Sequence, residues 1–165
     1  MSDVAALQRL NALAPDGAEP LLLTCCGSND WAHAMTEARP FHSLDQLFAT
    51  ADRIWWSLDR LDWLEAFAAH PKIGDTEGSS WSKAEQAGAY GAAPETQAEL
   101  ARLNEEYASR FGHIFILNAT GKTAAEMVAA LEKRLHNDPG EELRVAAEEQ
   151  RQITRLRLMK LVRTL

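Results

Sequence analysis

The chain has 165 residues, of which 46% are hydrophobic, and its formal net charge is −7. This length and composition suit one domain with a sizeable core. The acidic balance and the lack of a Lys/Arg run argue against a nucleic-acid surface, and no segment is apolar for long enough to span a membrane.

Helical periodicity dominates the first part of the chain. Asp3 is placed to cap a first helix, which should end before Pro15. Pro20 is predicted to open a short second helix. Residues 28–30, Ser-Asn-Asp, can cap a third helix that stops before Pro40.

A capping box opens the next predicted helix, because Ser43 is followed three residues later by Gln46. The apolar residues that follow recur at helical spacing and predict one buried stripe: Leu44, Leu47, Phe48, Ala51, Ile54 and Trp55. Asp59 can cap a further helix that runs up to His70.

The second half of the chain has similar signals. Ser82 and Glu85 have the spacing of a capping box and predict a short helix over residues 82–89. Pro94 suits the first position of a long helix, and Gly112 suits its end.

Residues 113–119 are a brief apolar stretch, which predicts either a buried segment or a short strand. Thr123 and Glu126 predict a further capped helix, and a last long helix should start near Pro139. Strand alternation is not sustained anywhere. The sequence therefore predicts an all-α fold, a single compact multi-helix domain over residues 1–165.

Cys25 and Cys26 are adjacent, and neighbouring cysteines rarely form a disulfide with each other. We interpret them as small buried residues rather than a redox or metal site. The N-terminus lacks a basic region followed by an apolar core, so no secretory signal is expected. A reducing, cytoplasmic location follows as the expectation.

The histidines do not have the spacing of metal ligands. None of the five lies one helical turn from another, and the chain has no Cys-x-x-Cys pair. We therefore expect no metal.

The stretch “EAFAAHPKIGD”, residues 65–75, ends an apolar helical run at a His-Pro pair. Because a residue before proline is pushed out of the helical region, His70 should leave the line of its helix. Its ring can titrate near neutral pH. One interpretation is a proton-transfer group, and the other is a surface histidine that stabilises the helix C-terminus.

Glu85 and Arg157 also allow two interpretations each. Glu85, with Gln86, lies on the first turn of the short predicted helix, where it is either half of the capping box or a carboxylate aimed at His70. Arg157 flanks the apolar stripe of the last helix. It either extends along that stripe toward water or holds a carboxylate through a bidentate fork.

Several motifs together resemble the 2-oxo-4-hydroxy-4-carboxy-5-ureidoimidazoline (OHCU) decarboxylase family, which acts in urate breakdown. “HPKIGD” at 70–75 matches the family's signature, and “SKAEQAGA” at 82–89 resembles its second motif. “LNEEYASRFGHIFILNATGKT” at 103–123 resembles the third motif, and “ITRLRLMKLV” at 153–162 the closing helix. “CCGSNDWAHAMTEARPF” at 25–41 matches the early region, so the resemblance covers almost the whole chain.

The resemblance implies a helical enzyme, often a homodimer, that decarboxylates OHCU to (S)-allantoin without a metal or organic cofactor. By motif match His70, Glu85 and Arg157 would be catalytic. The residues implied to contact substrate are Pro71, Ser82, Lys83, Ala84, Gln86, Phe115, Ile116, Leu117, Asn118 and Ala119.

The sequence also allows two other functions, namely a different enzyme and an interaction module. A lyase or hydrolase acting on another ureido compound would need similar groups. A helical interaction module would instead use its tryptophans, Trp55, Trp56, Trp63 and Trp81, against a partner. An enzyme predicts a polar pocket at His70, whereas a module predicts an exposed apolar groove.

Overall fold

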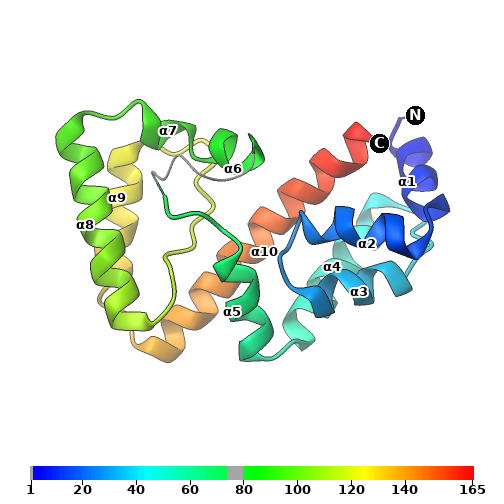
Figure 1. Ribbon diagram of the computed structural model, residues 1–165, viewed down its shortest axis with the longest axis horizontal. Helices are drawn as coiled ribbons and strands as arrows, with labels where there is room; N and C mark the ends of the chain where they lie inside the picture. Colours follow the sequence, from blue (N-terminus) through cyan, green and yellow to red (C-terminus); the bar gives the residue numbers. More distant parts are fainter. Residues whose placement is uncertain (1, 74–79) are drawn as a thin grey trace. The chain divides into compact units, whose positions relative to one another are not determined.

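The computed structural model describes residues 2–73 and 80–165 of the chain (Figure 1). Every regular element in these two ranges is an α-helix, which confirms the predicted all-α class. The helices are α1 Ser2–Ala12, α2 Pro15–Leu23, α3 Asn29–Glu37, α4 Leu44–Ser57, α5 Arg60–Ala68, α6 Ser80–Glu85, α7 Ala87–Tyr90, α8 Pro94–Phe111, α9 Ala124–Arg134 and α10 Pro139–Thr164.

The chain divides into two compact units. One unit, here called the terminal unit, consists of Met1–Ala66 with Arg151–Leu165. The other, the central unit, consists of Phe67–Gln150. The expectation of a single domain over residues 1–165 stays a prediction.

In the terminal unit α2 packs against α3, and α3 packs against α4. Trp31 of α3 is fully buried, and its indole Nε1 donates to the Ala51 carbonyl of α4 at 3.2 Å. The predicted stripe of α4 is confirmed, since five of its six residues are buried: Leu47, Phe48, Ala51, Ile54 and Trp55. An amphipathic helix is stabilised mainly through such a buried face.

Most predicted caps of this unit are confirmed. Ser28 accepts a hydrogen bond from the Trp31 amide, and Asp59 accepts one from the Asp62 amide. Ser43 accepts from the Gln46 amide, but the Gln46 side chain accepts from the amide of His42 rather than Ser43. The second half of that capping box is therefore displaced by one residue.

Two predicted helix starts are wrong. α1 begins at Ser2, so Asp3 lies inside its first turn, and α2 begins at Pro15, so Pro20 lies inside that helix. An interior proline costs a helix one backbone hydrogen bond. Ala18 and Leu22, one turn apart on α2, are fully buried, and their burial offsets that loss.

The central unit is built on α8 and α9, which lie side by side (Figure 1). Its core includes residues from both helices, such as Leu103, Tyr107 and Met127. As predicted, Pro94 is the first residue of α8 and Gly112 ends it, with a φ of +80° that favours glycine.

The link from α8 to α9 ends in a capping box. The Thr123 hydroxyl accepts from the Glu126 amide, and the Glu126 carboxylate accepts from the Thr123 amide, which confirms the prediction. Residues 114–119 before it contain no strand. Of the two predictions for this stretch, the buried segment is therefore the right one.

Candidate functional site

His70 lies two residues beyond the end of α5, and its amide still donates to the Phe67 carbonyl at 3.1 Å. Its ring Nε2 is 2.5 Å from Oε1 of Gln150, which is fully buried. The helix therefore ends two residues before the predicted end at His70. The ring is held by a polar partner 80 positions away in the chain.

The residues after His70 continue as a loop. Pro71 is half-buried, Lys72 is exposed and Ile73 is buried. The Asn104 side chain of α8 donates to the Ile73 carbonyl at 3.2 Å and so anchors this loop. Gly74 and Asp75, which complete the signature hexapeptide, lie outside the described residues.

The second motif forms α6 and α7 rather than one helix. α6 begins at Ser80, and the Ser82 carbonyl accepts the Gln86 amide in a helical bond of 3.1 Å. Because an N-cap residue lies outside the helix, the predicted capping box of Ser82 and Glu85 is wrong. Glu85 is the last residue of α6, and Gln86 is the N-cap of α7.

The side chains of this motif separate into two groups. Ser82, Glu85 and Gln86 are buried, whereas Lys83 and Ala84 are exposed. Burial of a carboxylate and an amide is costly without partners. Glu85 is therefore a buried carboxylate at the end of α6, not an exposed residue at a helix start.

The apolar segment Phe115–Ala119 joins α8 to α9 without regular structure. Four of its residues are buried, and Asn118 is half-buried. The Ile116 carbonyl accepts from Arg134 Nη1 at 2.6 Å, and the Asn118 amide donates to Glu149 Oε1 at 3.1 Å. Side chains of α9 and α10 therefore hold the backbone of this segment.

Arg157 belongs to the terminal unit and is 8% exposed. Its Nη1 donates to the Thr24 carbonyl at 3.3 Å, just after α2. This burial excludes the interpretation of a side chain that extends into water. The other predicted site residues, which run from His70 to Ala119, belong to the central unit.

Cys26 lies in the same part of the terminal unit. Complete burial raises the pKa of its thiol to about 12, although Ser28, Thr154 and Arg157 each act in the opposite direction. Both cysteines are buried and neither forms a disulfide. The interpretation as small buried residues agrees with this arrangement.

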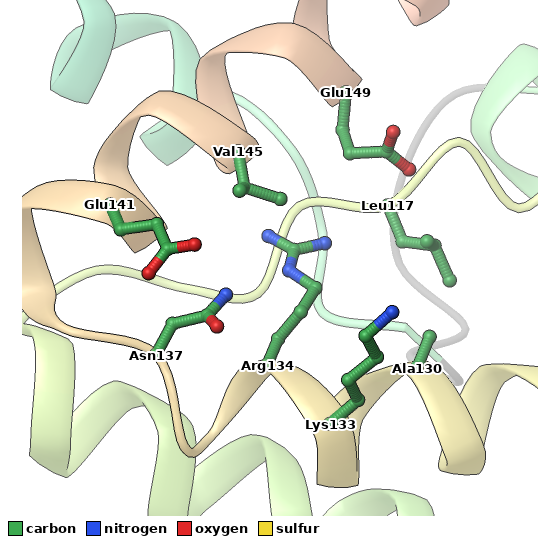
Figure 2. Close-up of a pocket in the computed structure, with 8 residues that line it drawn as sticks. All are labelled: Leu117, Ala130, Lys133, Arg134, Asn137, Glu141, Val145 and Glu149. Carbon is green, nitrogen blue, oxygen red and sulfur yellow. The ribbon is translucent and has the colours of Figure 1, made fainter.

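Figure 2 shows a pocket of the central unit of about 390 Å³. It is lined by Leu117, Ala130, Lys133, Arg134, Asn137, Glu141, Val145 and Glu149. In this view Arg134 reaches from α9 toward the segment that carries Leu117, and Glu149 lies beside that segment. The segment predicted to contact substrate therefore forms one wall of this pocket.

Sequence reasoning missed several of these polar contacts, including Gln150, Arg134 and Glu149. A signal was available in α10, where buried apolar residues recur at helical spacing but polar residues share the buried stripe: Glu142, Gln150, Thr154 and Arg157. Polar groups at core positions are retained where they have specific partners. No such signal could have named the partner of each.

Residues 2–73 and 80–165 contain neither a cluster of metal ligands nor a helix suited to a membrane. No group of three or more His, Cys, Asp or Glu residues there is placed to hold a metal ion. None of the helices there combines the length and the apolar character that crossing a membrane requires.

These features define an all-helical protein in which a half-buried histidine and a buried carboxylate lie at helix ends and one irregular segment is mostly buried. Residues 11–159 match the family described as OHCU decarboxylase. The chain belongs to the OHCU decarboxylase family.

Individual relatives support this family membership. The chain is 33% identical over 156 residues to the 2-oxo-4-hydroxy-4-carboxy-5-ureidoimidazoline decarboxylase of Haloferax volcanii, covering 92% of this chain and 93% of that one. It is 42% identical over 146 residues to the uric acid degradation bifunctional protein TTL of Arabidopsis thaliana. That match covers 83% of this chain but only 45% of the plant protein, so the chain spans less than half the length of that relative.

Solved structures have the same fold. A crystal structure of OHCU decarboxylase in the presence of (S)-allantoin is 42% identical, with a TM-score of 0.78, and the match covers 85% of this chain and 95% of that one. An (S)-allantoin synthase, 21% identical with a TM-score of 0.74, shares the fold over 94% of this chain and 53% of its own.

Proposed function

We propose that this chain decarboxylates OHCU and releases (S)-allantoin in the breakdown of urate. The observation that carries the proposal is the family match over residues 11–159, which includes His70, Glu85 and Arg157. The chain also spans 93% of the Haloferax relative, which is named for this decarboxylation.

The reaction breaks the bond between a ring carbon and its carboxylate. The electron pair of that bond stays in the ring as CO2 leaves, and a proton must then be delivered to one face to give a single enantiomer. Such a site needs groups that stabilise negative charge and a proton-transfer group that titrates near neutral pH.

His70 is the proposed proton-transfer group. Its imidazole can both bind and release a proton near neutral pH. The bond to Gln150 Oε1 orients the ring, which supports this role. Glu85 is buried at the end of α6 and is proposed to orient either the imidazole or the substrate hydroxyl.

Arg157 is proposed to bind the substrate carboxylate or the negative charge that develops as CO2 leaves. A guanidinium stays charged at every pH of interest and can bind a carboxylate through two parallel hydrogen bonds. Its burial supports this role, since a buried charge interacts more strongly with an anion than an exposed one does.

Substrate contacts are proposed for Pro71, for residues 82–86 and for the segment Phe115–Ala119. The ureido group and the ring amides of OHCU need hydrogen-bond donors and acceptors. An irregular segment can supply them from its backbone because helical pairing does not use them. Lys83 and Ala84 are exposed, so their backbone rather than their side chains is proposed to take part.

The function can be tested with OHCU freshly prepared from urate. Circular dichroism of the allantoin formed should show rapid production of the (S) enantiomer. The His70→Asn variant should stay folded and lose ~10²–10⁴-fold in rate, as expected for one proton-transfer group. Racemic allantoin, formed no faster than without protein, would refute the proposal and favour activity on another ureido compound.

Family membership also bears on the interaction module. Trp56 is 40% exposed, whereas Trp55, beside it, is buried. One exposed tryptophan is ordinary for a surface of this size. The match to a decarboxylase family therefore supports an enzyme instead.

We further propose one family domain over residues 1–165 that acts as a cytoplasmic homodimer without a metal or organic cofactor. The family match runs through both units, and two cysteines that form no disulfide suit a reducing compartment. Light scattering after gel filtration tests the dimer. Activity should survive a strong chelator, and loss that a divalent ion restores would show a metal requirement.

A further inference from the structure

The segment Phe115–Ala119 has no helix or strand of its own, so other elements must fix its backbone. Two side chains do so at positions two residues apart. Arg134 Nη1 donates to the Ile116 carbonyl at 2.6 Å, and Glu149 Oε1 accepts from the Asn118 amide at 3.1 Å. Leu117 lies between these two fixed points.

Arg134 is itself held firmly. Its Nε and Nη2 donate to Glu142 at 2.9 and 2.5 Å, and its side chain is only 8% exposed. The Glu142 carboxylate, which is fully buried, also accepts from the Tyr107 hydroxyl and from the Asn137 amide group. A charge so surrounded has one favourable position, because breaking the buried pair is costly.

The guanidinium also contacts the segment through an aromatic ring. Its Cζ lies 4.4 Å from the centre of the Phe115 ring, within the range of a cation–π interaction. Arg134 therefore fixes both the ring of Phe115 and the carbonyl of the next residue. Figure 2 shows Arg134 and Glu149 on two different helices, with Leu117 on the segment that both approach.

We propose that Arg134 and Glu149 are positioning residues of the decarboxylase: they hold the Ile116 carbonyl and the Asn118 amide so that the segment presents its remaining groups to OHCU in one geometry. This inference rests on the proposed function. Neither residue needs to touch the substrate, and both act through the backbone of the segment.

The chemistry of each residue suits this role. A planar guanidinium can bind Glu142 on one edge and the Ile116 carbonyl with its remaining nitrogen, whereas a lysine ammonium is a single point that cannot reproduce both contacts. Glu149 needs only an acceptor oxygen toward Asn118. A glutamine can supply that oxygen, but an alanine cannot.

The test compares Glu149→Ala with Glu149→Gln in the full chain. Glu149→Ala should raise KM for OHCU and lower kcat/KM by ~10–100-fold, because a misplaced binding group is costly for the rate. Glu149→Gln should restore most of the loss. Glu141→Ala is the matched control, since it removes an exposed carboxylate from the same pocket and should leave both constants unchanged.

Arg134→Lys supplies a second variant, and hydrogen exchange of the amides from Ile116 to Ala119 supplies a readout that needs no catalysis. Exchange should quicken at these amides in Glu149→Ala and Arg134→Lys, but not in α8. The inference would be overturned by an unchanged kcat/KM in Glu149→Ala and Arg134→Lys. It would also be overturned if Glu149→Gln lost as much kcat/KM as Glu149→Ala. Absence of OHCU turnover in the unaltered chain would instead refute the proposed function, and the exchange rates would still decide whether the two residues fix the segment.

Discussion

The contact between His70 and Gln150 determines how the imidazole can work. An amide oxygen only accepts hydrogen bonds, so ring Nε2, 2.5 Å from Gln150 Oε1, carries a proton. In the neutral ring the acceptor nitrogen is then Nδ1. Gln150 therefore selects a tautomer as well as an orientation.

Gln150→Glu should move the histidine limb of the pH–rate profile to higher pH. A carboxylate beside Nε2 stabilises the charged imidazolium, which raises the pKa of His70. The profile of kcat/KM against pH measures this shift. Gln150→Leu, which has similar size and no charge, should instead lower the rate because the ring loses its partner. Superimposable profiles for Gln150→Glu and the unaltered chain would mean that His70 does not control the rate.

The structure excludes the simplest alternative role of Glu85, which is half of a capping box with Ser82. Glu85 ends α6 instead of capping its start, so Glu85→Gln should not weaken a capping box. If its charge orients His70 or the substrate, Glu85→Gln should lower kcat/KM by ~10²-fold while the Tm changes little. Steady-state kinetics and thermal unfolding measure the two effects. Full turnover of OHCU by this variant would remove Glu85 from the proposed site.

Among the helices, α7 depends on one close approach. A Cβ atom built on Gly88 would lie 2.0 Å from the Lys122 carbonyl oxygen, which belongs to the backbone just before α9. Cβ atoms in proteins do not approach another heavy atom so closely, so any residue larger than glycine would force α7 away from that backbone. Gly88 therefore allows α7 to pack on the segment that leads into α9.

Gly88→Ala should destabilise the protein by ~1–3 kcal/mol, because the backbone has to shift to relieve the overlap. Gly91, at the end of the same helix, is the matched control, since a Cβ there meets nothing within 4 Å. Gly91→Ala should be close to neutral. Urea unfolding of the two variants measures the difference, and equal midpoints would show that α7 does not need this approach.

For the molecule as a whole, the buried titratable groups predict how stability depends on alkaline pH. Burial raises the pKa of Cys26 in the terminal unit from 9.0 to about 12. Burial also raises the pKa of Tyr107 in the central unit above its usual 10.0, and the hydrogen bond to Glu142 acts in the same direction. In both cases the unfolded chain loses its proton at a lower pH than the folded chain.

The free energy of unfolding should therefore fall as the pH rises from 9 toward 12. Each group lowers the free energy of unfolding by at most ~1.4 kcal/mol per pH unit, at pH values between its unfolded and folded pKa. Urea midpoints from pH 8 to 11 measure the slope. Cys26→Ala should flatten it from about pH 9 upward, and Tyr107→Phe should flatten it from about pH 10. A midpoint that stays constant over this range would contradict the assigned burial.

Local sequence signals determined most of the helices. The caps at Ser28, Ser43 and Asp59, and the capping box at Thr123, depend on residues within one turn of each other. For that reason they could be predicted without any tertiary contact. The motifs of the resemblance also gave the family, which the match over residues 11–159 confirms.

Errors in the helix boundaries arose where packing outweighs local preference. Ser82 has the spacing of an N-cap, but the chain is already helical from Ser80. Pro20 has the character of a helix start, but α2 continues through it with Ala18 and Leu22 buried on either side. Burial of a helix face can offset the loss of one local hydrogen bond.

Only the tertiary structure decided which polar groups meet. Gln150 faces His70 from 80 residues away, and Arg134 reaches the Ile116 carbonyl from 18 residues away. In the sequence Arg134 is simply a basic residue in the last turn of a helix, where a charge usually stays in water. Helical periodicity identifies the buried face of a helix, but the partner of a buried charge depends on how distant elements pack.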